Sequence, residues 1–261
     1  MNLIEILKDS LALLRKEPKA FLPKLVTTFL YSVYFLWGAR LTVTLYRLTD
    51  EPNTAGLSGM MVQVLLFFLF IVAILLADLL SYAMYPSIVA AHREGKQVKL
   101  LQSLKDAIRA WKVIITFGAI IFAVMTAISL PATMLALSPY GTGNPLLTAA
   151  AGILAIIAVI ALSIAVFFVV PIAVVEHSGV IPTFLQSLKL GMKHTPELLQ
   201  INLILLVLVT TSLIITMLSE FQGITAGLAI AAFIITRLVQ ALIYSYICVI
   251  NPYVYLHVKE N

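Results

Sequence analysis

The sequence predicts an all-α integral membrane protein with six transmembrane helices and three short amphipathic helices on its cytoplasmic face. Two observations predict this class: apolar residues make up 61% of the chain, and only 11% of its residues are charged. A soluble domain carries about 25% charged residues, and its interior would be too small for this much apolar surface. We therefore expect a multi-pass protein of the cell membrane, in which residues 1–261 form a single transmembrane domain.

Six apolar runs mark the predicted spans, because a helix of about 20 apolar residues crosses the hydrocarbon core of a bilayer. They cover residues 25–46, 60–91, 113–137, 146–175, 198–219 and 221–256. The even-numbered spans are longer than the odd-numbered ones, and each carries a proline towards its predicted cytoplasmic end.

Lysine and arginine gather in the connections on one side of these spans. Five lie in the N-terminal segment up to Lys24, six lie between the second and third spans, two lie between the fourth and fifth, and one is Lys259. These are 14 of the 17 basic residues, and the opposite side holds only Arg40 and Arg47. Because cytoplasmic loops are enriched in Lys and Arg, we expect both termini to be cytoplasmic.

Three segments on this basic side predict short helices with one apolar and one polar face: the N-terminal segment, residues 98–111 and residues 181–193. Helices of this kind lie in the plane of the membrane interface, with basic residues towards anionic head groups. The residues expected in that role are Lys16, Lys105, Arg109, Lys189 and Lys193.

An internal repeat links these helices to the spans. The run LQSLK occurs at residues 101–105 and 185–189, and its Ser-Leu pair also occurs at residues 10–11. In all three places a basic residue follows the serine by six positions. The spacing predicts three tandem two-span repeats, at approximately residues 1–95, 96–179 and 180–261. Since each unit returns the chain to the same side, we expect pseudo-threefold symmetry.

The prolines of the long spans are Pro86, Pro171 and Pro252. Each removes a backbone donor and frees the carbonyl four residues earlier, which must find another donor inside a membrane. We expect kinks here that either shape the bundle or act as gates.

Asp78 and Arg237 are the main candidates for a functional site, because ionised groups deep in a bilayer are costly and face the interior. They either form an ion pair between two repeats or belong to a polar site on a solute or ion pathway. Tyr244 and Gln240 lie in the same polar span as Arg237, and Tyr244 occupies the repeat position of Asp78. We expect these residues to converge near the pseudo-symmetry axis.

Motifs of soluble enzymes and metal sites are missing from the sequence. It contains no phosphate-binding glycine loop, no G-x-S-x-G elbow and no H-E-x-x-H spacing, and Cys248 is its one cysteine. We expect no catalytic residues, no cofactor, no metal and no nucleic-acid partner.

The segments SLALLRKEP at residues 10–18 and SLKLGMKHTPE at residues 187–197 resemble those of a group of prokaryotic polytopic membrane proteins. The group includes the YciC-like proteins and the membrane domain of glycerophosphodiester phosphodiesterases, and the resemblance implies no particular activity. The three-repeat architecture is also similar to that of mitochondrial carriers. Their P-x-[DE]-x-x-[KR] signature is absent, since Ile88, Ala173 and Val254 stand two positions after the prolines.

Two functions remain open from the sequence. The first is a non-enzymatic module that organises membrane lipids or docks a protein partner or a second copy of the chain. The alternative is a small transporter or channel with a polar site around Asp78 and Arg237.

Overall fold

The structure, a computed structural model, describes residues 3–50, 54–138, 144–219 and 226–260. These ranges are helical throughout, apart from short connections. The elements are α1 (Leu3–Lys16), the 3-10 turn η1 (Pro18–Phe21), α2 (Leu22–Asp50), α3 (Thr54–Arg93), α4 (Leu100–Arg109), α5 (Trp111–Leu137), α7 (Pro145–Val166), α8 (Val169–Val175), α9 (Val180–Lys193), α10 (Thr195–Ser219) and α11 (Ala226–Glu260).

Six segments of the described chain are long and apolar enough to cross a membrane, as the sequence predicts. They are Pro18–Tyr46, Gly59–Arg93, Trp111–Leu135, Leu146–Val175, Thr195–Ile215 and Ile230–Glu260. Each overlaps one predicted span, although residues 221–225 of the sixth prediction lie outside the described residues. The all-α, multi-pass class is therefore confirmed.

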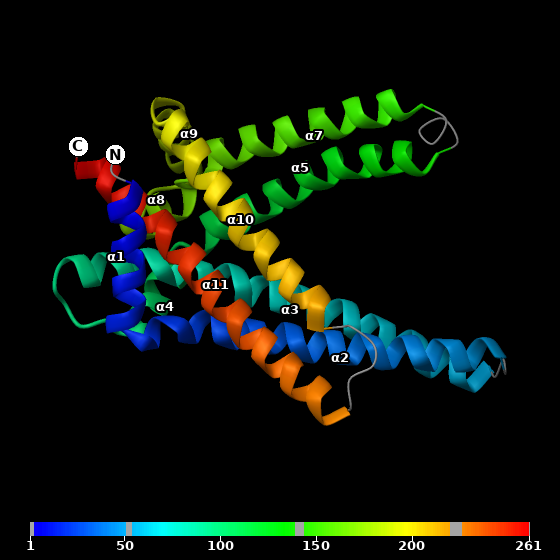
Figure 1. Cartoon of the computed structure of the whole chain (residues 1–261). Helices are drawn as coiled ribbons and strands as arrows, with labels where there is room; N and C mark the ends of the chain where they lie inside the picture. The colour runs from blue at the N-terminus through cyan, green and yellow to red at the C-terminus, as the bar shows by residue number, and fades with distance from the viewer. Residues whose placement is uncertain (1–2, 51–53, 139–143, 220–225, 261) are drawn as a thin grey trace.

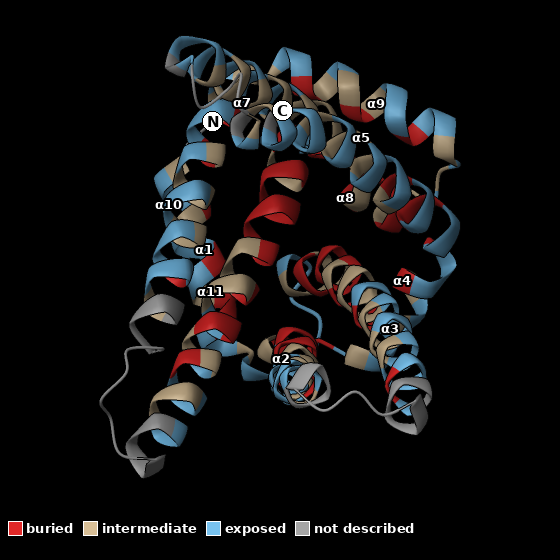
Figure 2. Ribbon diagram, turned by 90° about the vertical axis from the view of Figure 1, so that its right-hand side faces the viewer, coloured by how far each residue is buried: buried red, intermediate tan, exposed pale blue. Residues whose placement is uncertain are grey.

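Consecutive long helices pair into three hairpins: α2 with α3, α5 with α7, and α10 with α11 (Figure 1). Figure 2 views the bundle from the far end of α2 and α3 and shows the three pairs at three corners. Both termini lie at the opposite end, beside α1, α8 and α9. The described core is concentrated at that end, where α3, α8 and α11 contact one another in pairs.

The segments around the three repeat prolines form this core. Residues 83–89, 167–174 and 248–255 are buried almost throughout. Towards the other end of the hairpins, large apolar side chains such as Phe68, Phe122 and Leu206 are exposed. Apolar exposure on long helices is expected where lipid, which is as apolar as leucine, covers them.

The fourth span is interrupted between α7 and α8, at Phe167 and Phe168. Three polar contacts replace the lost helical ones. Asn251 Nδ2 donates to the Phe167 carbonyl at 2.6 Å, the Phe168 amide donates to Ser187 Oγ at 3.2 Å, and Ser187 Oγ donates to the Ala165 carbonyl at 2.8 Å. Partners from α9 and α11 therefore stabilise the break.

The equivalent prolines behave differently, since α3 and α11 continue through Pro86 and Pro252. The helix is thus broken before Pro171 but continuous through Pro86 and Pro252. Ser187 and Asn251 supply hydrogen-bond partners at the break before Pro171.

Three short helices, α1, α4 and α9, lie where the Ser-Leu pairs occur in the sequence. The serine of each pair, Ser10, Ser103 or Ser187, is buried. Part of the apolar surface of α4 and α9 faces outward, since Leu101, Ile108, Ile181, Leu185 and Met192 are exposed. Other large apolar residues, such as Leu104 and Leu190, pack against the core together with the small residues.

Candidate functional site

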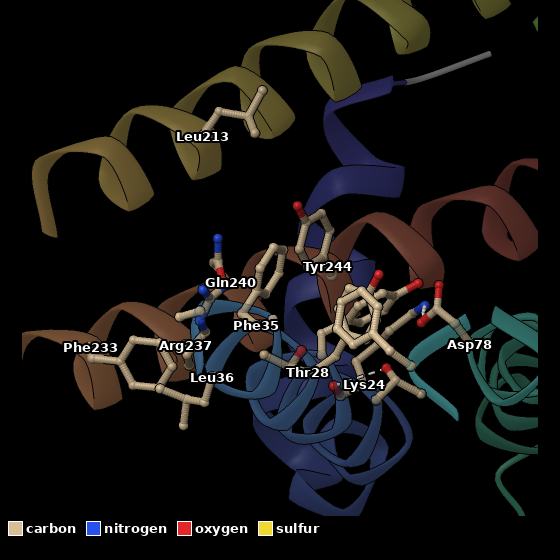
Figure 3. Close-up of a pocket in the computed structure, with 16 residues that line it drawn as sticks. Lys24, Thr28, Phe35, Leu36, Asp78, Leu213, Phe233, Arg237, Gln240 and Tyr244 are labelled. Atoms are coloured by element: carbon tan, nitrogen blue, oxygen red, sulfur yellow. Dashed lines mark hydrogen bonds and ion pairs between the residues drawn. The ribbon is translucent and has the colours of Figure 1, made fainter. Parts of the chain in front are cut away.

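A cavity of about 1030 Å³ lies between α2 and α11 and is completed by α3 and α10; we call it the α2–α11 cavity. All four residues predicted for a polar site line it (Figure 3). Its lining residues are Lys24, Thr27, Thr28, Tyr31, Tyr34, Phe35, Leu36, Gly38, Ala39, Phe67, Asp78, Leu213, Phe233, Arg237, Gln240 and Tyr244.

At one end of the cavity Lys24 Nζ forms an ion pair with Asp78 Oδ1 at 2.7 Å. This corrects the interpretation in which Asp78 pairs with Arg237. Pro23 and Lys24 are buried in the first turn of α2, which places the ammonium beside α3. The pair joins two helices of one hairpin instead of two repeats.

Arg237 lies towards the other end of the cavity, on α11 (Figure 3). Its guanidinium carbon lies 5.2 Å from the centre of the Phe35 ring and 5.0 Å from that of Phe233. Arg237 Nη1 also donates a 2.8 Å hydrogen bond to Gln240 Oε1. The two aromatic rings and the amide hold this cation within the membrane-spanning part of the bundle.

Aromatic side chains line much of the remaining wall. Tyr34 and Phe67 stack at a ring-centre distance of 4.1 Å and connect α2 with α3. On the opposite wall Ser212 Oγ donates to the Tyr244 hydroxyl at 3.5 Å and connects α10 with α11. The cavity is thus lined by groups that suit an apolar body together with a few polar contacts.

Burial divides this lining into a floor and a rim. Lys24, Thr27, Thr28 and Gln240 are buried polar residues of the floor. The rim residues Phe35, Leu36 and Leu213 are apolar and exposed. The lining therefore combines buried polar side chains with exposed apolar ones.

The lining comes from the first and third predicted repeats, and none of its described residues belongs to α5, α7, α8 or α9. The expected convergence near a pseudo-symmetry axis stays a prediction. Asp78 and Tyr244 do share a cavity, which lies between the first and third hairpins.

A second cavity, of about 270 Å³, has contributions from all three hairpins. It is lined mostly by apolar residues, with Tyr82, Ser163, Asn202 and Asn251 as polar members. Ser163 Oγ donates to Asn202 Oδ1 at 2.8 Å, and Asn251 bonds to the broken span. The sequence analysis assigned no site or partner to either asparagine, although an amide inside an apolar run is a signal of interhelical bonding.

At the end with the termini, Glu176 connects three elements. It accepts hydrogen bonds from Tyr255 Oη, from Lys259 Nζ at 2.9 Å and from Gln186 Nε2 at 3.0 Å. Burial by itself would raise the pKa of this carboxyl, but the three donors outweigh burial and lower the pKa below its usual value of 4.5. Glu176 thereby ties α11 and α9 to the end of α8.

The basic residues predicted for the interface, Lys16, Lys105, Arg109, Lys189 and Lys193, are all exposed on α1, α4 and α9. Arg109 Nη1 lies 3.8 Å from Asp106 Oδ1 of its own helix, a long contact whose arginine side is exposed. Within the described ranges, no group of three or more His, Cys, Asp or Glu residues is placed to hold a metal ion.

Lys24 is the residue of the cavity that sequence reasoning misplaced, because it was counted among the basic residues outside the spans. Two features of the sequence identify it. Lys24 stands directly before the first apolar run, and the next apolar run contains an acid, Asp78. A lysine at such a boundary either snorkels to the interface or turns inward to pair.

Comparison with protein-family models, with curated proteins and with solved structures found no match for this chain.

Proposed function

We propose that this chain is a non-enzymatic membrane protein that binds an amphiphilic molecule of the bilayer in the α2–α11 cavity and so organises membrane lipid. The observation that carries the proposal is the buried polar floor behind an exposed apolar rim. An amphiphile matches both parts, because its chain meets the rim and the aromatic walls while its head group meets the floor.

The volume of the cavity supports a ligand of this size. A cavity of about 1030 Å³ lies just above the range usual for small-molecule sites, about 300–1000 Å³. Its long axis follows α2 from Lys24 to Ala39, a rise of about 22 Å at 1.5 Å per residue. This length exceeds that of a head group and suits an attached hydrocarbon chain.

The surface features fit a protein anchored at a charged interface. We propose that α1, α4 and α9 lie on the cytoplasmic face, with their outward apolar residues in the bilayer and basic residues such as Lys105 and Lys189 near anionic head groups. Both termini then lie in the cytoplasm. The burial of Ser10, Ser103 and Ser187 supports three related repeats about a pseudo-threefold axis.

A transporter is the second candidate, and one observation favours it. The fourth span is discontinuous beside the cavity that all three hairpins line, and discontinuous spans form binding sites in many transporters. Binding of a second copy or another protein is a further proposal, for which the exposed faces of α4 and α9 offer surface.

The experiment that tests lipid binding compares the purified protein with a variant whose cavity is filled. Ala39→Trp places an indole in the cavity lining, whereas Ala73→Trp places the same group on an exposed position of α3 away from the lining. Native mass spectrometry counts the lipid molecules retained by each protein. We expect retained lipid in the wild type and in Ala73→Trp, and its loss in Ala39→Trp.

Equal lipid retention by Ala39→Trp and Ala73→Trp, with matching thermal unfolding, would contradict binding in this cavity. Flux of a solute through protein-containing liposomes, blocked by Ala39→Trp, would favour the transporter instead.

A further inference from the structure

We infer that the α2–α11 cavity selects an amphiphile whose head group carries a protonated primary amine, and that Asp78 is the residue that recognises it. The inference rests on the proposed function, because it names the class of molecule that the cavity holds. It follows from the orientation of the Lys24–Asp78 ion pair relative to the cavity.

The ion pair presents its negative end to the cavity. The Lys24 side chain is 9% exposed, whereas that of Asp78 is 35% exposed, and both residues line the cavity. A head group that enters therefore meets the carboxylate first, with the ammonium of Lys24 behind it. At this end of the cavity an anionic group would face Asp78 at close range, whereas the cation Arg237 lies towards the other end.

Asp78 has capacity for another donor. An ionised carboxylate accepts about four hydrogen bonds, and the ion pair with Lys24 uses Oδ1. The second oxygen is directed to no other residue by a hydrogen bond in the described part of the chain. A carboxylate with open lone pairs thus lies at the Lys24 end of the cavity.

The neighbouring side chains suit a cation with N–H donors. Tyr31 and Tyr244 line the same end of the cavity, and their rings offer the electron-rich faces that attract ammonium groups. A quaternary ammonium would gain the ring contacts but has no N–H to donate to Asp78. A primary ammonium can make the ring contacts and also donate an N–H hydrogen bond to Asp78. This hydrogen bond is what distinguishes it from a quaternary ammonium.

Two phospholipids differ only in whether the head group carries a primary or a quaternary ammonium. Dioleoyl phosphatidylethanolamine and dioleoyl phosphatidylcholine share their chains and phosphate and differ in whether the nitrogen carries hydrogens. Purified wild-type protein is incubated with an equimolar mixture of the two in detergent, and native mass spectrometry measures the ratio of the bound species. Dodecylamine and dodecyltrimethylammonium, tested in the same way, separate recognition of the amine from recognition of a phospholipid.

We expect the wild type to prefer each primary amine over its trimethylated counterpart by about tenfold, the effect of one charge-assisted hydrogen bond. Asp78→Asn should bring the ratio close to one. Because this variant leaves Lys24 buried without its partner, the double variant Lys24→Gln with Asp78→Asn removes both charges and should also give a ratio close to one. Glu94→Gln, an exposed acid outside the cavity, should keep the wild-type ratio.

Each remaining outcome is decisive. Lipid bound at a ratio of one in the wild type, and displaced by Ala39→Trp, would overturn the amine inference and leave the proposed function standing. A wild-type preference that persists in the double variant would overturn the role of Asp78. Absence of any lipid sensitive to Ala39→Trp would contradict the proposed function itself.

Discussion

Asn251 on α11 donates a 2.6 Å hydrogen bond to the backbone carbonyl of Phe167, which Pro171 deprives of its helical donor. One side chain of the third hairpin thus completes the interrupted span of the second. In the core of a membrane protein this contact matters, because water is not at hand to replace it.

Asn251→Leu should therefore destabilise the protein by about 1–3 kcal/mol, the cost of a buried carbonyl left unsatisfied. Thermal unfolding in detergent measures the loss. Thr42→Ala, which removes an exposed hydroxyl bonded within its own helix, is the matched control and should change little.

Pro171→Ala should partly rescue Asn251→Leu. The substitution restores an amide at position 171 that can donate to the Phe167 carbonyl four residues earlier. If the double variant unfolds at the temperature of Asn251→Leu alone, the freed carbonyl is not the cause of the instability.

Gly191→Ala should be strongly destabilising. A Cβ at this position of α9 would lie 2.4 Å from the backbone carbonyl oxygen of Ile164 on α7, and backbone cannot move aside as a side chain does. We expect a loss of about 1–3 kcal/mol, as for overpacking in a core. Gly152→Ala on α7, where a Cβ meets nothing within 4 Å, is the control in the same unfolding assay.

Glu176 should make stability depend on acid pH. Its pKa is lowered in the folded state, so its stabilising contribution is present above the usual value of 4.5 and is lost as the pH falls through the lower folded value. Glu176→Gln should lower the unfolding free energy by about 2 kcal/mol at neutral pH. The unfolding free energy of the variant should also change less with pH in the acid range than that of the wild type. Unfolding curves between pH 3 and 7 that are parallel for the two proteins would contradict this role.

Labelling with a membrane-impermeant thiol reagent tests the orientation. Lys105→Cys on α4 should react only after the cells are opened, whereas Asn144→Cys, at the start of α7, should react on intact cells. The native Cys248 is buried and should not interfere. The reverse pattern would place the termini and the basic helices outside the cell.

Composition and local pattern were sufficient to predict the class and the spans. Six continuous apolar runs of this length favour helices that satisfy their own backbone hydrogen bonds in a bilayer, and the described helices overlap all six. The short helices α1, α4 and α9 were also predictable, because their polar and apolar residues recur with the period of a helix.

The polar partners were decided by the tertiary structure alone. Asp78, Arg237, Gln240 and Tyr244 stood out as costly residues in apolar runs, and they do share one cavity. Which groups they contact depends on helix rotation and crossing, since Lys24 and not Arg237 lies within 2.7 Å of Asp78. In the same way, Pro171 marked a freed carbonyl, but only the packing of α9 and α11 against it brought Ser187 and Asn251 to the break. Sequence periodicity reports which face of a helix is apolar, whereas the identity of a partner 54 or 84 residues away depends on how the faces meet.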